Sequence, residues 1–209
     1  MPVVKPQPYT TEGVQTDMVA VAALERDAEL MLRVREGDPA SFALLLERHR
    51  VPVIHFLYRM VQNQAVAEEL AQEVFLRVYR SRHSYEPTAR FTTWLFRIAT
   101  HLALNQIRDR RHEKSSESLD EDPRDGISRQ VADTLPNVEQ DLLRQARLNE
   151  VRQAIETLPA KQKAAVLMHK YQEIEYSQIA KVLSCSESAV KSLLFRAYET
   201  LRSRLAHMV

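Results

Sequence analysis

Glycine and cysteine are scarce in this chain of 209 residues, which has three glycines and one cysteine. Few glycines leave few positions for the tight turns that join β-strands, while good helix formers such as Ala, Leu, Arg, Glu and Gln dominate. The single cysteine, Cys185, cannot form a disulfide within the chain, which favours a reducing compartment. We therefore expect an all-α protein in the cytoplasm.

Long hydrophobic runs and the patterns typical of enzymes are lacking as well. The longest apolar run, "MVAVAAL" over residues 18–24, is too short to cross a bilayer. The seven histidines do not fall at metal-ligand spacings, and the chain has neither a nucleophile elbow nor a phosphate-binding loop. We therefore expect no catalytic residue, no metal, no cofactor and no small-molecule substrate, so an enzyme is disfavoured.

Charge is nearly balanced overall, at net +1, but it is distributed unevenly along the chain. Residues 26–112 contain 14 arginines against 10 acidic residues, and residues 138–209 contain 11 basic against eight acidic residues. Between them, residues 113–137 contain seven acidic and three basic residues. Two basic blocks separated by an acidic stretch indicate two modules, with nucleic acid as one candidate partner.

The pattern of apolar residues divides the chain in the same way. Residues 1–23 show no period and are predicted to be a disordered extension. Residues 24–112 and 138–209 are each predicted to form a small helical domain. The segment 113–137 is rich in Ser, Asp and Glu, and it predicts a flexible acidic linker between the two domains.

Helix boundaries in the first domain are marked by glycine, a capping residue and prolines. Gly37 is expected to end a helix that starts near Leu24. Asp38 followed by Pro39 predicts the start of the next helix, as N-cap and first helical residue. Pro52 lies inside that second helix and is expected to kink or break it.

Residues 90–111, "RFTTWLFRIATHLALNQIRDRR", are predicted to form a helix with two different faces. The apolar face, expected to lie against the core, carries Phe91, Leu95, Ile98 and Leu102. The neighbouring face carries Trp94, Arg97, His101, Asn105 and Arg108. A large ring, cations and hydrogen-bonding groups together suit stacking on unpaired bases and holding phosphates. We expect this face, with Tyr85 in the preceding loop, to bind single-stranded or melted DNA, although Trp94 alone is more typical of a core.

The stretch "YSQIAKVLSCSESAVKSLL", over residues 176–194, fits a helix-turn-helix. Ala180 allows the two helices to cross closely, and Ser186 can cap the second one. Ser184 or Cys185 occupies the turn position where glycine is common. The second helix would point outward at its N-terminal half, the part that enters a DNA major groove, through Glu187, Ser188, Lys191, Ser192, Phe195 and Arg196. A plain helical hairpin with a solvated face is the alternative.

A further helix is expected after Asn63, running to about Ser81. It carries an acidic, polar patch formed by Glu68, Glu69, Gln72 and Glu73. On a chain that is expected to bind DNA elsewhere, this patch indicates a protein partner, although a solvated helix face would show the same pattern.

Three stretches together resemble the extracytoplasmic-function (ECF) sigma factors of bacterial RNA polymerase. They are "EELAQEVFLRVYR", "FTTWLFRIATHLALNQIRDRRH" and "IETLPAKQKAAVLMHKYQEIEYSQIAKVLSCSESAVKSLLFRAYETLR". The resemblance covers about residues 26–112 and 138–206, in the order and spacing of the family's modules. It implies a four-helix promoter-melting domain (sigma region 2), a flexible linker and a four-helix domain with the helix-turn-helix (sigma region 4), acting in transcription initiation and stress response.

The resemblance also implies partners and surfaces. The partners would be core RNA polymerase, through its β′ clamp helices and β flap, promoter DNA in duplex and melted form, and an anti-sigma factor, often membrane-anchored in this family. The clamp helices would bind Glu68, Glu69, Leu70, Gln72, Glu73 and Phe75. The −10 element would meet Arg77, Tyr85, Trp94, Phe96, Arg97, His101, Asn105 and Arg108. The −35 element would be read by Glu187, Ser188, Lys191, Ser192, Phe195 and Arg196.

Some positions depart from the family pattern. His101 stands where Asn is common, which predicts an unusual −10 preference. Lys191 and Leu193 stand where some members have arginine, which predicts fewer −35 contacts. The alternative interpretation is a standalone helix-turn-helix regulator that binds duplex DNA without polymerase.

Overall fold

The computed structural model describes residues 26–116 and 138–208, and every regular element in these ranges is helical, as predicted. A first helix over residues 26–35 is followed by α2 (Pro39–Val61), α3 (Gln64–Arg80), the short 3-10 helix η1 (Arg82–Ser84) and α4 (Phe91–Ser116). After the gap come α5 (Val138–Glu156), α6 (Ala160–Tyr171), α7 (Tyr176–Leu183), α8 (Glu187–Arg204) and the 3-10 helix η2 (Ala206–Met208). The extension predicted over 1–23 and most of the predicted linker lie outside the described residues. In the part of the chain that is described, no helix has both the length and the apolar character needed to cross a membrane.

The predicted boundary between the first two helices is confirmed. Gly37 has φ +99°, a left-handed conformation that ends the first helix at little cost for a residue without Cβ. The Asp38 carboxylate accepts a hydrogen bond from the Ala40 backbone N–H at 2.9 Å and caps α2. α2 is one helix from end to end, so the break that Pro52 could have caused does not occur. His49 and Val53, on either side of the proline, are both buried.

α4 is longer than the sequence indicates. It continues to Ser116, so residues 113–116, predicted as the start of the linker, are helical. Residues 105–116 contain neither glycine nor proline, and the local sequence therefore gives no signal to end the helix at 113. The prediction of an irregular linker is wrong for these residues.

A buried acidic residue ties the first helix to α2. Asp27 is 3% exposed, and its Oδ2 accepts a hydrogen bond from His49 Nε2 at 2.8 Å. Arg48 forms a second ion pair with the same carboxylate. A buried carboxylate is costly unless it is paired and hydrogen-bonded, so these contacts fix the position of the first helix on α2.

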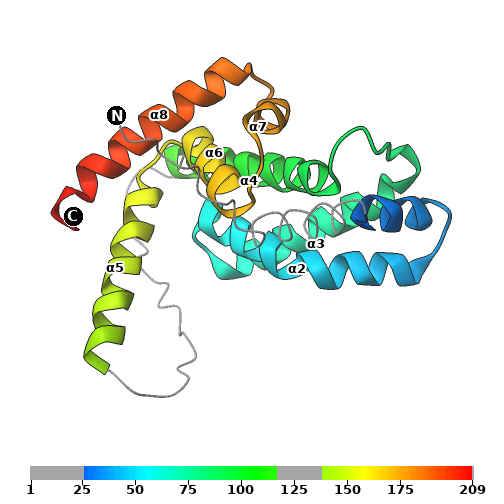
Figure 1. Cartoon of the computed structure of the whole chain (residues 1–209), viewed down its shortest axis with the longest axis horizontal. Helices are drawn as coiled ribbons and strands as arrows, with labels where there is room; N and C mark the ends of the chain where they lie inside the picture. The colour runs from blue at the N-terminus through cyan, green and yellow to red at the C-terminus, as the bar shows by residue number, and fades with distance from the viewer. Residues whose placement is uncertain (1–25, 117–137, 209) are drawn as a thin grey trace, which may run out of the picture.

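The two modules pack against each other, with α6 and α7 between α8 and the first module (Figure 1). His101 of α4 donates a hydrogen bond from Nε2 to the Val182 carbonyl of α7 at 3.1 Å. The Arg59 guanidinium lies 4.2 Å from the centre of the Tyr171 ring, a cation–π contact between α2 and the C-terminal end of α6. The second module therefore covers part of α4, which the sequence does not predict.

Candidate functional site

The helix-turn-helix predicted in the second module is formed by α7 and α8. Ser184 provides the turn with φ 52°, the left-handed conformation that glycine usually supplies. The Ser186 hydroxyl accepts a hydrogen bond from the Ala189 backbone N–H at 3.2 Å, so this serine caps α8 as predicted. The cap fixes where α8 begins and hence which of its residues face outward.

Packing beneath α8 turns its N-terminal half toward solvent. Val190 and Leu194 of α8 are buried, as is Ile179 of α7, while Leu193 is partly buried. All the residues predicted to read duplex DNA are exposed: Glu187, Ser188, Lys191, Ser192, Phe195 and Arg196. Phe195 is 66% exposed, a large apolar ring with no intramolecular reason to be there. The structure thus brings the six residues together on one free surface.

Charges on this surface are only loosely engaged. The Lys191 ammonium lies 3.7 Å from the Glu187 carboxylate, one turn earlier on α8, and both side chains are more than half exposed. Such a surface ion pair contributes little to stability and is readily exchanged for another partner. Lys191 can therefore swing to a phosphate without a large cost.

α4 separates its two predicted faces as expected. Its apolar face is buried through Phe91, Leu95 and Leu102, with Ile98 partly buried. The other face leaves four of its predicted DNA-binding residues exposed: Arg97, His101, Asn105 and Arg108. One of them is already engaged, because His101 donates to Val182 of the second module.

The aromatic residues of the predicted −10 surface are mostly buried in the first module. The Trp94 ring is partly buried, with its centre 5.0 Å from that of Tyr85. Tyr85 is 2% exposed, and burial, followed by the nearby Asp27 charge, raises the pKa of its hydroxyl. Phe96 is 1% exposed and packs edge-on against Phe56 at 5.2 Å. In this conformation, Tyr85 and Phe96 do not reach the surface that the four exposed residues of α4 form.

The acidic patch borders an apolar groove between α2 and α3. This docking groove has a volume of about 690 Å3, and its lining includes Phe42, Leu46 and Ile54 of α2 and Glu68, Gln72, Phe75, Leu76 and Tyr79 of α3. Glu68 and Gln72 are exposed, whereas Phe75 is 6% exposed and contributes mainly to the floor. Leu70 is mostly buried, and Glu69 is exposed outside the groove lining. The structure thus adds a hydrophobic floor to the predicted patch.

One ion pair joins a residue predicted to bind polymerase, Glu73, to a residue predicted to bind the −10 element, Arg77. Arg77 Nε donates to the Glu73 carboxylate at 2.6 Å, one helical turn earlier on α3. This interaction lowers the pKa of Glu73. Arg77 is thereby held on the same face of α3 as Glu73 of the acidic patch.

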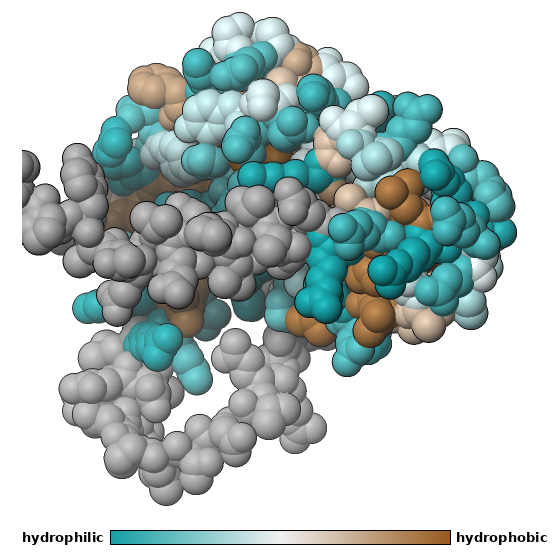
Figure 2. All heavy atoms as spheres, turned by 45° about the vertical axis from the view of Figure 1, so that its right-hand side comes forward, coloured by the Kyte–Doolittle hydropathy of each residue, from teal (hydrophilic) through white to brown (hydrophobic). Residues whose placement is uncertain are grey.

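Two features of these surfaces are missed by the sequence analysis. The first is that Leu76 and Tyr79 remain 48% and 42% exposed at the docking groove. Figure 2 shows that apolar side chains are exposed among hydrophilic ones on the face in view. The exposure of Leu76 and Tyr79 depends on how α2 crosses α3, which a periodic pattern on a single helix does not reveal. The bond between His101 and Val182 joins residues 81 positions apart, and no local signal points to it.

Comparison with known proteins agrees with this layout of two modules. Residues 45–113 match the family model of sigma-70 region 2, and residues 148–201 match that of sigma-70 region 4. The chain is 34% identical to the RNA polymerase sigma factor CarQ of Myxococcus xanthus over 178 residues, covering 85% of this chain and 97% of CarQ. It is 30% identical over 176 residues to the ECF RNA polymerase sigma factor SigW of Bacillus subtilis, with 83% and 93% covered.

A solved structure shows the same fold. It is the sigma factor RpoE in complex with the anti-sigma factor NepR from Bartonella quintana, which superposes with a TM-score of 0.61 at 21% identity, over 79% of this chain and 96% of that one. The region 4 match includes α7 and most of α8, and the region 2 match includes α3 and most of α4. From these matches and the extent of the sequence similarity, the chain belongs to the ECF sigma factors of the sigma-70 family.

Proposed function

We propose that this chain directs bacterial core RNA polymerase to promoters by binding the enzyme, the −35 element and the melted −10 element through three separate surfaces. The observation that supports this is that two exposed faces carrying cations lie on different modules, one on α8 and the other on α4. A standalone duplex-binding regulator would need only α8. Neither an exposed cationic face on α4 nor an apolar docking groove would then have a purpose.

The −35 surface is the N-terminal half of α8. A helix that enters the major groove contacts base edges with the residues nearest its N-terminus. Lys191 and Arg196 supply contacts to phosphates or guanine edges, and Glu187 can accept a hydrogen bond from a cytosine amino group. Because Ser186 fixes the start of α8, it also fixes which positions of the helix face outward.

The −10 surface is the exposed face of α4. Arg97 and Arg108 supply phosphate contacts, and His101 and Asn105 supply groups that can read the edges of unpaired bases. Opening the duplex costs on the order of 1–2 kcal/mol of stacking free energy per base step. The module is too small to supply this alone, so we expect weak DNA binding in the absence of polymerase.

The polymerase surface is the docking groove between α2 and α3. Its apolar floor and polar rim have the composition of a protein interface, with a hydrophobic centre surrounded by hydrophilic groups. Glu68 and Gln72 on the rim face the solvent from which the β′ clamp helices would approach. The β flap would contact the second module.

Three further aspects belong to the same proposal. The modules acting on DNA would be residues 24–112 and 138–209, and the intervening segment would tether them. An anti-sigma factor would be the natural inhibitor, because the structural relative RpoE is itself in complex with one. The chain would act without catalysing a reaction, in the cytoplasm, where core RNA polymerase transcribes DNA.

Reconstitution tests the proposed function directly. The purified chain is mixed with bacterial core RNA polymerase, complex formation is followed by gel filtration, and transcript start sites are mapped on genomic DNA. We expect a stable complex that starts transcripts at defined sites sharing two sequence elements. Tight binding of the isolated chain to duplex DNA, with no polymerase complex, would instead indicate the standalone regulator.

A variant pair shows whether the groove is the docking surface. Glu68→Lys combined with Gln72→Lys puts two cations on the rim of the groove, and we expect the polymerase complex to be lost. The control, Glu47→Lys, places a cation on an exposed position of α2 that does not line the groove. Retained binding by the double variant, with a normal circular dichroism spectrum, would move the polymerase surface elsewhere.

A further inference from the structure

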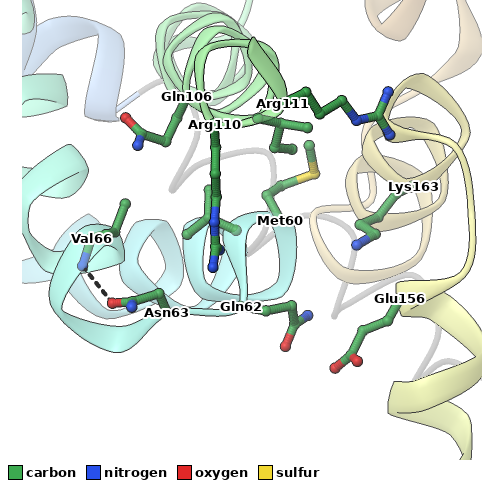
Figure 3. A pocket seen from close by; sticks show the side chains of 11 residues that line it. Met60, Gln62, Asn63, Val66, Gln106, Arg110, Arg111, Glu156 and Lys163 are labelled. Atoms are coloured by element: carbon green, nitrogen blue, oxygen red, sulfur yellow. Dashed lines mark hydrogen bonds between the residues drawn. The ribbon is translucent and has the colours of Figure 1, made fainter. Parts of the chain in front are cut away.

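A second cavity, unrelated to the docking groove, lies between the two modules. It has a volume of about 710 Å3, within the range typical of small-molecule sites. Figure 3 shows its walls, which come from the end of α2 and the start of α3, from α4 and from α5 and α6. The cavity therefore exists only while the modules are packed together.

The most unusual residue in this cavity is Lys163 of α6. It is 7% exposed, and in Figure 3 its ammonium points into the cavity. Within the described residues the ammonium makes no hydrogen bond or ion pair, and Glu156 acts on it only through longer-range attraction. Burial accordingly lowers the pKa of Lys163. The side chain is mostly buried while its ammonium faces the cavity without a direct partner, so an anion in the cavity would be a favourable partner for it.

The rest of the lining reinforces this cationic character. Arg110 and Arg111 of α4 also line the cavity, against Glu156 as the only carboxylate among its lining residues. Arg110 extends from α4 towards the start of α3, where Asn63 uses its side-chain oxygen to cap Val66 and keeps its amide N–H groups available. Guanidinium groups bind phosphate through paired N–H donors, and a lysine binds it as a point charge.

We propose that this cavity binds a small molecule that carries two or more phosphate groups and bridges α4 of the first module to α6 of the second. Three cations against one carboxylate leave a net charge of +2 in the lining, which a single monoanion would not neutralise. Met60, Val66 and Ile107 add apolar surface for a non-phosphate part of the ligand. Because both modules line the cavity, the bound ligand stabilises the packed arrangement.

Isothermal titration calorimetry with pyrophosphate tests this site on the full chain. The titration is run at constant ionic strength of about 0.15 M, so that attraction to the general surface is screened. We expect saturable binding with one molecule per chain. Lys163→Met, which keeps the volume of the side chain and removes an unpaired charge, should weaken binding by roughly tenfold or more. The measurement needs neither polymerase nor promoter, so its outcome does not depend on whether the proposed function is correct.

Lys170→Met is the matched control, since Lys170 is an exposed lysine on the same helix that does not line the cavity. The affinity of the Lys170→Met variant for pyrophosphate should stay within about twofold of that of the unsubstituted chain. Arg110→Gln with Arg111→Gln, at two exposed positions, should reproduce the loss even if Lys163→Met fails to fold.

Three results would overturn the proposal. Pyrophosphate that does not bind would remove the site, and equal weakening by Lys163→Met and Lys170→Met would show attraction to overall charge only. A short single-stranded oligonucleotide that displaces pyrophosphate, and that loses affinity with Lys163→Met in the same way, would assign the cavity to nucleic acid instead of a small molecule.

Discussion

α4 and α8 both present a basic face to solvent, but they are supported differently. α4 packs against α2 and α3 of its own module and against α6 and α7 of the other, so its buried residues occupy more than one side of the helix. The main contacts of α8 are with elements of its own module, and Phe195 on its outward face is exposed. α4 is therefore the embedded helix, packed against elements of both modules, and α8 is the open helix, although both carry an exposed face.

This difference separates the two DNA-binding steps of the proposed function. The residues of α8 that are proposed to read duplex DNA are already exposed in the packed chain. Use of the whole α4 face requires the second module to release His101, which is hydrogen-bonded to Val182. The arrangement of the free chain thus favours contact with the −35 element and restrains contact with the −10 element.

The largest difference between the two helices is expected in the stability change when one phenylalanine is replaced in each. Phe96→Ala removes a buried ring of α4 and should lower the free energy of unfolding by about 3–5 kcal/mol. Phe195→Ala removes an exposed ring of α8 and should change it by less than about 0.5 kcal/mol, while weakening initiation at a −35-dependent promoter. Urea denaturation and transcription assays measure the two effects. If Phe195→Ala is the more destabilising substitution, the assignment of embedded and open helices is wrong.

Removing two cations from α8, the open helix, tests its predicted role in DNA binding. Lys191→Ala with Arg196→Ala should weaken binding of duplex −35 DNA by about tenfold or more, and reduce the salt dependence by roughly one unit of slope per lost phosphate contact. Arg202→Ala with Arg204→Ala removes the same charge from the far end of α8 and serves as the control. Fluorescence anisotropy at several salt concentrations measures both. Equal slopes for the two double variants would place the phosphate contacts elsewhere.

The smallest expected effect concerns the restraint on α4. His101→Ala removes the hydrogen bond to the Val182 carbonyl and should cost about 0.5–1.5 kcal/mol of stability. Asn105→Ala, one turn later on the same exposed face, should leave stability unchanged. Thermal unfolding compares the two, and small-angle scattering detects whether the modules separate. A radius of gyration that increases with Asn105→Ala but not with His101→Ala would contradict the restraint.

Much of the local structure follows from the sequence because its signals are local. Asp38 and Ser186 cap the helices they were predicted to cap, and Ser184 takes the left-handed turn conformation. The outward face of α8 follows from the 3.6-residue period once its buried residues are known. Each of these features depends on residues only a few positions apart.

Features that depend on distant residues are not predictable in the same way. Phe96 is one residue from Arg97, and helical geometry turns it toward Phe56 of α2, a residue 40 positions away. The burial of Lys163 and the contact of His101 with Val182 arise only when the modules meet. In each case the period of one helix identifies a face, but only packing decides what covers it.

The ion pair between Glu73 and Arg77 has a consequence for how the partners influence each other. If polymerase takes up Glu73, Arg77 loses its intramolecular partner and becomes free for a DNA phosphate. Each partner then changes the affinity of the chain for the other, and thermodynamic linkage requires the two changes to be equal. One exchangeable ion pair on α3 is thus sufficient to make polymerase binding and promoter binding cooperative.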